Sequence, residues 1–283
     1  MITVALFGAG GKMGCRITDN LKDDPEYHLL YVETSEAGLT RLRERGLSAT
    51  PYDKAAAAAE VVVLAVPDAL IGKIAATQVV PFLRSGTMVI CLDPAAPMAG
   101  VLPSRPDITY FVTHPCHPPV FHDETEPEAR QDFFGGVRAK QNIVCALMQG
   151  PEQDYSRGEA IARRMFAPVM KAHRITVEQM AILEPALSET VTATLLTAIR
   201  EAMDEAVRRG VPYEAARDFL LGHVRINLGM FFGEIDTPLS DGAKLAVARA
   251  KTQLLQPDWK RVFEPEAIRE SINAITGAES SQT

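Results

Sequence analysis

The stretch ITVALFGAGGKMG, residues 2–14, decides the fold. It begins with the apolar run Ile2–Phe7, which is typical of a buried strand, and it ends inside a helix predicted over Met13–Lys22. Its four glycines are Gly8, Gly10, Gly11 and Gly14. The G-x-G-x-x-G spacing fails at Met13, but the related G-x-x-G-x-x-G spacing is met. Because glycine has no Cβ, backbone amides and the helix N-terminus at such a turn can approach a pyrophosphate.

A dinucleotide is therefore expected at this turn, with Lys12, Met13 and the four glycines around its phosphates. Glu33 ends the second predicted strand, 19 positions after Gly14, which is near the spacing of the acid that binds the adenosine ribose. Its carboxylate would accept hydrogen bonds from the 2′- and 3′-hydroxyls and repel a 2′-phosphate, which favours NAD over NADP. The alternative is a glycine turn that serves packing alone.

Further apolar runs recur along the first half of the chain, at residues 28–33, 60–66, 87–92, 108–112 and 143–148. Helical segments such as 69–83 separate them. This alternation predicts a Rossmann-type, doubly wound parallel sheet that is buried on both faces. The third run ends in VLAVPD, residues 63–68, at the expected nicotinamide edge. Asp68 there either contacts the dinucleotide or caps the next helix.

The second half of the chain is predicted to be helical. Thr176 and Gln179 fit a capping box, and a helical pattern then runs from about residue 177 to residue 209, where Gly210 ends it. Pro185 interrupts this pattern and is expected to kink the helix, because proline removes one backbone donor.

Two more helices are predicted, one opening at Pro212 and one capped by Asp241 and running to about Leu255. The tail Ala278–Thr283 is predicted to be disordered. We therefore expect an NAD-binding Rossmann-type domain over residues 1–176 and an all-helical substrate and dimerisation domain over residues 177–283.

The bulk composition excludes several classes of protein. The 283 residues carry 29 Lys+Arg against 36 Asp+Glu, without a basic block, so nucleic acid is not an expected partner. The four cysteines form no Cys-x-x-Cys pair, which argues against a zinc knuckle or a disulfide framework. The N-terminus lacks a secretory leader pattern, and no apolar run approaches the ~18 residues that a membrane span needs. A cytoplasmic protein without a membrane partner is expected.

Histidines gather in THPCHPPVFHDE, residues 113–124, which holds three of the six in the chain. This stretch follows the strand predicted at residues 108–112, so it lies at the carboxyl edge of the sheet, where ligands bind in open α/β folds. His114 is the first candidate for catalysis, since it is nearest the strand end, and His117 is the second. His122 is expected to be peripheral and Cys116 to lie in the core. The alternative is a set of satisfied polar residues in a proline-stiffened loop.

The helical half offers an acidic counterpart in Glu184, which directly precedes Pro185. Ser188 and Thr192 follow at i+4 spacing, so the three side chains are expected on one helix face. Glu184 could act as a metal ligand, a general base or a substrate clamp. A solvated glutamate beside a helix kink is the alternative.

Several motifs together resemble a known superfamily. GAGGKMG, VVVLAVPD and the helical second half are similar to the 6-phosphogluconate/3-hydroxyacid dehydrogenase and ketol-acid reductoisomerase superfamily. With THPCHPPVF and ILEPALSETVTATL added, the chain resembles the D-apionate oxidoisomerases more narrowly. Simple hydroxyacid dehydrogenases keep a catalytic lysine on a helix where this chain has none, since residues 177–207 contain no Lys. That departure disfavours plain dehydrogenase chemistry.

The resemblance implies that NAD oxidises a branched 2,3-dihydroxy sugar acid, D-apionate, and that the carbon skeleton rearranges to 3-oxo-isoapionate. A simple NAD-dependent 3-hydroxyacid or sugar-acid dehydrogenase remains an alternative, and so does a non-catalytic NAD(H)-binding regulator. The second alternative is disfavoured by the histidine cluster and by the absence of a basic DNA-binding surface.

Two further expectations follow. His114 and Glu184 are predicted to converge across the domain cleft and bind one divalent ion. The imidazole and carboxylate ligands favour zinc, with manganese or magnesium as alternatives and His117 as a candidate third ligand. A homodimer is expected because helical second domains of this superfamily commonly complete a partner's site. The apolar stretch LGMFF, residues 228–232, would help to bury that interface.

Overall fold

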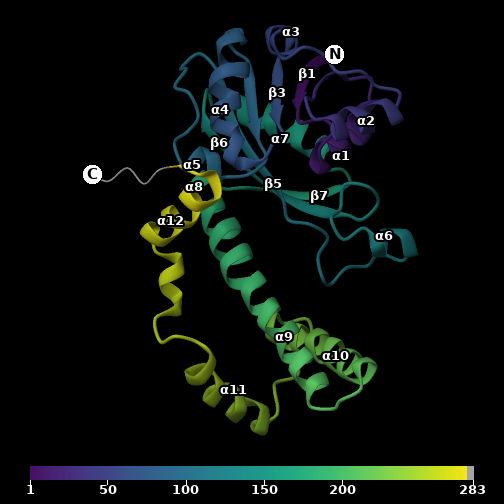
Figure 1. The fold of residues 1–283 in the computed structure, drawn as a ribbon, viewed down its shortest axis with the longest axis vertical. Coiled ribbons are helices and arrows are strands. Elements are labelled where there is room, and N and C mark those ends of the chain that lie inside the picture. Colours follow the sequence, from purple (N-terminus) through teal and green to yellow (C-terminus); the bar gives the residue numbers. More distant parts are fainter. Residues whose placement is uncertain (279–283) are drawn as a thin grey trace. The chain divides into compact units, whose positions relative to one another are not determined.

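The computed structural model describes residues 1–278 and consists of two compact units (Figure 1). The first unit contains Met1–Pro185 and the segment from Ile268 onward, and the second contains Ala186–Ala267. The expected functional boundary after residue 176 stays a prediction. Apart from Ala278, the tail predicted to be disordered lies outside the described residues.

A seven-stranded sheet in the order β2-β1-β3-β4-β5-β6-β7 forms the centre of the first unit. The strands are β1 (Ile2–Phe7), β2 (Tyr27–Val32), β3 (Val61–Leu64), β4 (Met88–Cys91), β5 (Thr109–Pro115), β6 (Gln141–Gln149) and β7 (Val169–Arg174). The first five are parallel, β6 is antiparallel to β5, and β7 is parallel to β6. The predicted doubly wound α/β fold is thus confirmed, with one antiparallel pair that the sequence did not indicate.

Alternate residues of each strand point to opposite faces of the sheet, and both faces are buried because helices cover them. Leu6 of β1 belongs to one core cluster and Phe7 to the other. Helices α1 (Lys12–Leu21) and α7 (Asp154–Met165) cover the first face, and α3 (Tyr52–Ala58) and α4 (Asp68–Ile74) cover the second. Two connected short helices, Ala75–Val79 and Val80–Phe82, continue α4, and the remaining helices of this unit are α2 (Glu36–Glu44), α5 (Ala95–Met98) and α6 (Pro127–Gln131).

Close backbone contact explains the glycines of the first turn. Gly8 has a left-handed φ of 77°, and Gly11 is the N-cap of α1. A Cβ on Gly14 would overlap the carbonyl oxygen of Gly8 and the Cα of Ala9. The helix therefore begins directly against the end of β1, which places its N-terminus at the carboxyl edge of the sheet.

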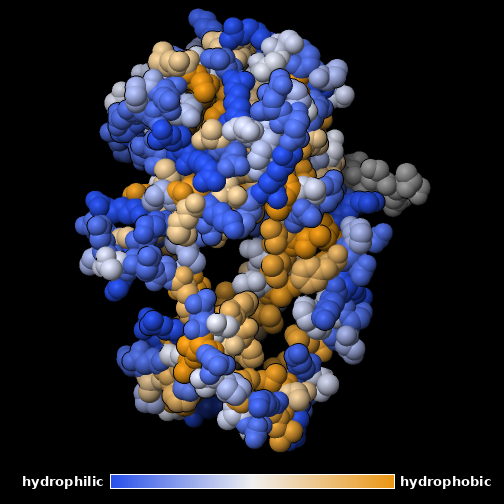
Figure 2. Space-filling view, turned by 180° about the vertical axis from the view of Figure 1, so that it is seen from behind, coloured by the Kyte–Doolittle hydropathy of each residue, from blue (hydrophilic) through white to orange (hydrophobic). Residues whose placement is uncertain are grey.

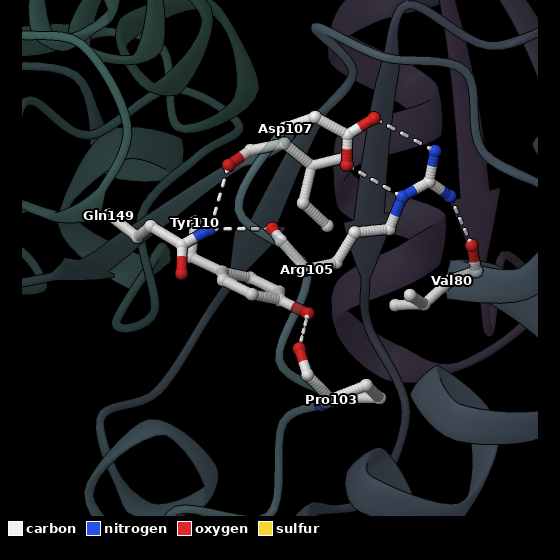
Figure 3. A network of polar contacts seen from close by, with 7 residues as sticks. Val80, Pro103, Arg105, Asp107, Tyr110 and Gln149 are labelled. Atoms are coloured by element: carbon white, nitrogen blue, oxygen red, sulfur yellow. Dashed lines mark hydrogen bonds and ion pairs between the residues drawn. The ribbon is translucent and has the colours of Figure 1, made fainter.

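A polar network fixes the connection that leads into β5 (Figure 3). The Arg105 guanidinium donates to the carbonyl of Val80 (2.6 Å) and to the carboxylate of Asp107 (2.9 Å). Gln149, at the end of β6, donates to the carbonyl of Arg105 (2.9 Å), and the Tyr110 hydroxyl donates to a carbonyl of the same connection. These contacts anchor the start of the strand that carries His114.

The C-terminal elements include the three predicted helices, together with a 3₁₀ turn and a last helix that were not predicted. They are α8 (Val177–Ala181), a π-helical segment (Ile182–Ala193), α9 (Thr194–Arg208), α10 (Tyr213–Phe231), α11 (Asp241–Leu254), a 3₁₀ turn (Trp259–Phe263) and α12 (Pro265–Thr276). The capping box of Thr176 and Gln179 is present. Ser240, and not Asp241, caps α11, because its hydroxyl accepts from the backbone N–H of Ala243.

The π-helical segment is how the chain accommodates Pro185. The segment has a wider repeat than an α-helix, so the expected i+4 face of Glu184, Ser188 and Thr192 does not apply. Ser188 and Thr192 are exposed, and the Thr192 hydroxyl donates to the carbonyl of Leu187.

The continuous helical stretch Val177–Arg208 meets the length and composition criterion for a membrane span, with a mean hydropathy of 1.2 over its best 18-residue window. The expectation that no apolar stretch approaches this length is therefore wrong. Only 11% of that window is buried in the protomer.

The contact beneath Gly14 predicts a stability effect. Gly14→Ala should lower the free energy of unfolding by roughly 1–3 kcal/mol, because the added methyl overlaps backbone atoms that have no room to move. Gly222→Ala, in α10, places its methyl where no atom lies within 4 Å, and should raise stability by about 0.5–1 kcal/mol. Urea unfolding of both variants measures the difference, and equal midpoints would contradict it.

Candidate functional site

Three neighbouring parallel strands bring titratable side chains to one edge of the sheet. Asp68 is the first residue of α4 and follows β3, Asp93 lies two positions after β4, and His114 is near the end of β5. The pairing of Leu64 with Cys91 and of Cys91 with Val112 aligns the ends of these strands. Glu184, from the start of the π-helical segment, reaches the same edge within the first unit.

The structure brings His114 and Glu184 together. His114 Nε2 lies 3.5 Å from Glu184 Oε2, and each side chain is 22% exposed. On the other side of the ring, Nδ1 lies 2.8 Å from the carbonyl oxygen of Leu92 and 3.8 Å from Asp93 Oδ2. The hydrogen bond at Nδ1 orients the imidazole at the end of β4, and its Nε2 faces Glu184.

These contacts determine where the proton of the imidazole lies. A carbonyl oxygen can only accept, so Nδ1 carries a hydrogen and donates it to Leu92. The lone pair of an unprotonated Nε2 would then face a carboxylate oxygen, which is repulsive. A proton or a cation between Nε2 and Glu184 removes the repulsion. The pair can thus hold one proton and exchange it with a bound molecule, which is general acid–base chemistry.

Two carboxyl groups flank this pair. Burial raises the pKa of Asp68 to about 6, and the negative charge of Asp93 adds to the effect while His114 opposes it. Burial also raises the pKa of Asp93, against the hydrogen bond from the Ala95 amide and the nearby His114, and the charge of Glu184 raises it further. Asp93 was not predicted, although an acid directly after an apolar strand, in CLDP, is a signal that could have found it.

Glu33 lies at the other end of the site. Its Oε2 accepts from the amide of Gly10 (3.0 Å), and its Oε1 accepts from the amides of Thr34 and Ser35 and from the Ser35 hydroxyl. Partial burial alone would raise the pKa of Glu33, but these hydrogen bonds lower it below the usual value. A Cβ on Gly38 would overlap this carboxylate. The carboxylate is thus ionised and fixed beside the glycine turn, where a ribose acceptor is expected.

The other histidine-loop residues have different surroundings. The ring of His117 lies 6.2 Å from that of His114, and its Nδ1 lies 2.9 Å from the carbonyl oxygen of Phe134. His122 is exposed and accepts from the amide of Glu124 within the loop. Cys116 is exposed, so the expectation that it lies in the core is wrong. The proline-rich loop therefore turns Cys116 outward while keeping His117 near His114.

The residues present do not fit the expected zinc site. Zinc is held by three or four protein ligands, whereas within residues 1–278 no group of three or more His, Cys, Asp or Glu side chains could hold a metal ion. His114 and Glu184 supply two donors, and His117 has its Nδ1 at the Phe134 carbonyl. The zinc expectation is thus not supported.

Two family models match the chain. Residues 122–276 match the C-terminal model of decarboxylating phosphogluconate dehydrogenase, and residues 2–96 match the NADPH-binding domain of acetohydroxy acid isomeroreductase. The two models together cover most of the chain and join a nucleotide-binding half to a helical half.

Curated relatives match along nearly the whole length. The D-apionate oxidoisomerase of Cupriavidus necator is 57% identical over 274 residues, covering 96% of this chain and 99% of the relative. The D-apionate oxidoisomerase of Rhizobium rhizogenes is 56% identical, and the match covers 98% of this chain and 100% of the relative. The crystal structure of a semialdehyde dehydrogenase NAD-binding protein from Cupriavidus necator, in complex with calcium and NAD, superposes with a TM-score of 0.95 at 56% identity, covering 98% of this chain and 100% of that one.

The raised pKa of Asp68 predicts a pH-dependent effect on stability. The folded protein holds the Asp68 proton up to about pH 6, whereas the unfolded chain releases it near 3.8. Stability contributed by this group therefore falls as pH rises through that window. Asparagine carries no charge at either pH, so Asp68→Asn avoids the loss of stability that ionisation of Asp68 causes. The melting temperature of the variant should therefore be above that of the wild type at pH 8 and close to it at pH 4. Thermal melts across this range test it, and a constant difference would contradict the assignment.

Proposed function

The chain belongs to the D-apionate oxidoisomerase family, within the superfamily of 6-phosphogluconate dehydrogenases and ketol-acid reductoisomerases, and on that premise we propose that it oxidises D-apionate with NAD and rearranges the carbon skeleton to 3-oxo-isoapionate. The observation that carries the chemistry is the facing pair of His114 Nε2 and Glu184 Oε2 at the carboxyl edge of the sheet. Both steps of such a reaction move protons on substrate oxygens, and this pair holds and exchanges a proton.

The first step is an oxidation at C2 of the substrate. Glu184 accepts the proton of the C2 hydroxyl as the C2–H bond breaks, and NAD, when bound, supplies the hydride acceptor. The carbonyl of Leu92 keeps Nδ1 of His114 protonated, so that Nε2 stays directed at the reacting oxygens. The product of this step is a 2-keto acid that still carries the tertiary alcohol at C3.

The second step moves the hydroxymethyl group from C3 to C2. The C3 hydroxyl loses its proton to a base, the C3–CH₂OH bonding electrons attack the C2 carbonyl carbon, and C3 becomes a ketone. The former C2 carbonyl oxygen gains a proton. Glu184 first passes the proton that it accepted in the oxidation to solvent. It is then again the base for the C3 hydroxyl, and the His114 imidazolium is the acid, so one proton is taken and one is given in this step. His117, at 6.2 Å from His114, is a further candidate for contact with the substrate.

The cofactor is proposed to be NAD. Gly8, Gly10, Gly11 and Gly14, with Lys12 and Met13, would hold the pyrophosphate by the N-terminus of α1, and Asp68 would lie at the nicotinamide. The ionised carboxylate of Glu33 would accept from the ribose hydroxyls and repel a 2′-phosphate. A divalent ion bound by His114 and Glu184 remains a prediction, with substrate oxygens needed to complete its ligands.

The second unit supports a proposal of a homodimer. Helices α9 and α10 line an apolar groove of about 610 Å³ that includes Ile199, Met203 and Phe219. Phe231 and Phe232, at the end of the predicted LGMFF surface, are 60% and 73% exposed. Figure 2 shows apolar side chains gathered on the surface of these helices. A second copy of the chain would cover the groove and the exposed face of the Val177–Arg208 helix.

A cytoplasmic location is proposed from the cysteines. All four are free thiols, three of them buried and Cys116 exposed. Disulfides form in oxidising compartments, so an exposed free thiol suits a reducing one.

Turnover of D-apionate tests the function directly. The wild type with D-apionate and NAD should produce NADH, and carbon NMR should show the rearranged skeleton. His114→Ala and Glu184→Gln should each reduce kcat by roughly 10²–10⁴-fold, because each removes one member of the acid–base pair. If NADH forms but the carbon skeleton of the product is not rearranged, the protein is a simple dehydrogenase.

The matched control is His122→Ala, which removes an exposed histidine of the same loop and should keep wild-type turnover. Full activity of either site variant would contradict the roles of His114 and Glu184. Full activity after exhaustive chelation would contradict the predicted divalent ion and leave the acid–base pair.

Light scattering at micromolar concentration tests the dimer. The wild type should have twice the protomer mass of 30.8 kDa. Phe232→Asp places a charge on the proposed interface and should give a monomer, whereas Phe133→Asp, at a 78% exposed phenylalanine of the first unit, should not. A monomeric wild type, or one that partitions onto lipid vesicles, would contradict the proposal.

A further inference from the structure

The connection between β5 and β6 places an aromatic ring beside the glycine turn. The ring centroid of Phe134 lies 3.4 Å from Nζ of Lys12 and 4.6 Å from Cζ of Arg16. Lys12 is the first residue of α1, and Arg16 lies one turn further along the same helix. Both cations at the N-terminal end of this helix thus contact the same aromatic ring, which belongs to a segment more than a hundred residues away in the sequence.

Lys12 and Arg16 have no acidic partner in the described part of the chain, where neither takes part in an ion pair. Like charges one helical turn apart repel each other. The face of an aromatic ring attracts a cation without neutralising it. Phe134 therefore holds the two cations near each other while their charge stays available to an anion at the helix N-terminus.

The position of Phe134 is itself fixed by His117. Nδ1 of His117 lies 2.9 Å from the Phe134 carbonyl oxygen, and the two rings meet edge to face at 5.9 Å. His117 has a φ of 60°, a conformation that non-glycine residues rarely adopt. The backbone at His117 is thus turned so that its ring reaches both Phe134 and, at 6.2 Å, the ring of His114.

The chain beyond Phe134 is also ordered by specific contacts. Gly135 and Gly136 have φ values of 71° and 78°. Oδ2 of Asp132 then accepts hydrogen bonds from three successive backbone amides, those of residues 137–139. The segment closes on itself around Asp132, which leaves the Phe134 ring directed at α1.

We propose that Phe134 is a positioning residue for the pyrophosphate of the dinucleotide and that Arg16 binds this pyrophosphate together with Lys12. The proposal rests on the proposed NAD-dependent function. Phe134 touches the two cations, and they touch the anion, so Phe134 acts through them. His117 accordingly links the phosphate end of the site to the histidine that moves protons.

Calorimetric titration with NAD and with ADP-ribose tests the proposal. Phe134→Leu keeps an apolar side chain but removes the ring, and should weaken both ligands by about tenfold. Phe134→Tyr keeps the ring and should bind both ligands like the wild type. Without the ring, Lys12 and Arg16 would lie further from the phosphates and attract them less strongly. Because salt weakens this electrostatic attraction, the affinity of Phe134→Leu should also depend less on salt concentration than that of the wild type.

Matched controls separate this effect from loss of packing. Phe133→Leu alters the adjacent exposed phenylalanine and should leave affinity unchanged. Arg16→Gln should weaken ADP-ribose, whereas Lys22→Gln, at the other end of α1, should not. The proposal would be overturned if Phe134→Leu bound the ligands as tightly as the wild type or more tightly. It would also be overturned if Phe134→Tyr lost as much affinity as Phe134→Leu. A wild type that binds ADP-ribose but does not oxidise D-apionate would instead overturn the proposed function.

Discussion

The in-register parallel pairing of β3, β4 and β5 is the constraint on which the candidate site depends. Leu64, Cys91 and Val112 lie side by side across these strands, so the residues that follow them emerge at one edge. The carbonyl of Leu92 then lies where it can accept from His114 Nδ1. A shift of β5 by one residue would turn His114 to the other face of the sheet and remove it from Glu184.

The charges at the two ends of the site have opposite signs. Lys12 and Arg16 are cations held at the glycine turn, whereas Asp68, Asp93 and Glu184 gather at the far edge. Oxidised NAD has the complementary pattern, with anionic phosphates and a cationic nicotinamide ring. Burial raises the pKa of Asp68 and of Asp93, and the negative charge of a neighbouring carboxylate adds to each effect. A cationic ring nearby would favour their ionised forms, which couples cofactor binding to proton release.

Features that depend on local patterns were predictable from the sequence. The glycine turn, Glu33 and six of the seven strands follow from apolar runs and spacing. The convergence of His114 and Glu184 was expected because they were predicted to bind one divalent ion together. β7 was missed because its residues are half-buried or exposed. Asp93 was missed although it directly follows an apolar strand. Phe134 depends on a loop held by His117 and Asp132, which no periodicity reveals.

The distortion at Pro185 links a sequence feature to the geometry of the site. Proline has no N–H and its ring crowds the preceding turn, so an α-helix passing through this position loses a hydrogen bond and bends. Here the chain widens instead into a π-helical segment that begins at Ile182, two residues before Glu184. π-Helical turns of this kind are frequent at functional sites. The widened segment carries both Glu184 and Pro185, so the proline lies directly beside the carboxylate that faces His114 without belonging to the acid–base pair.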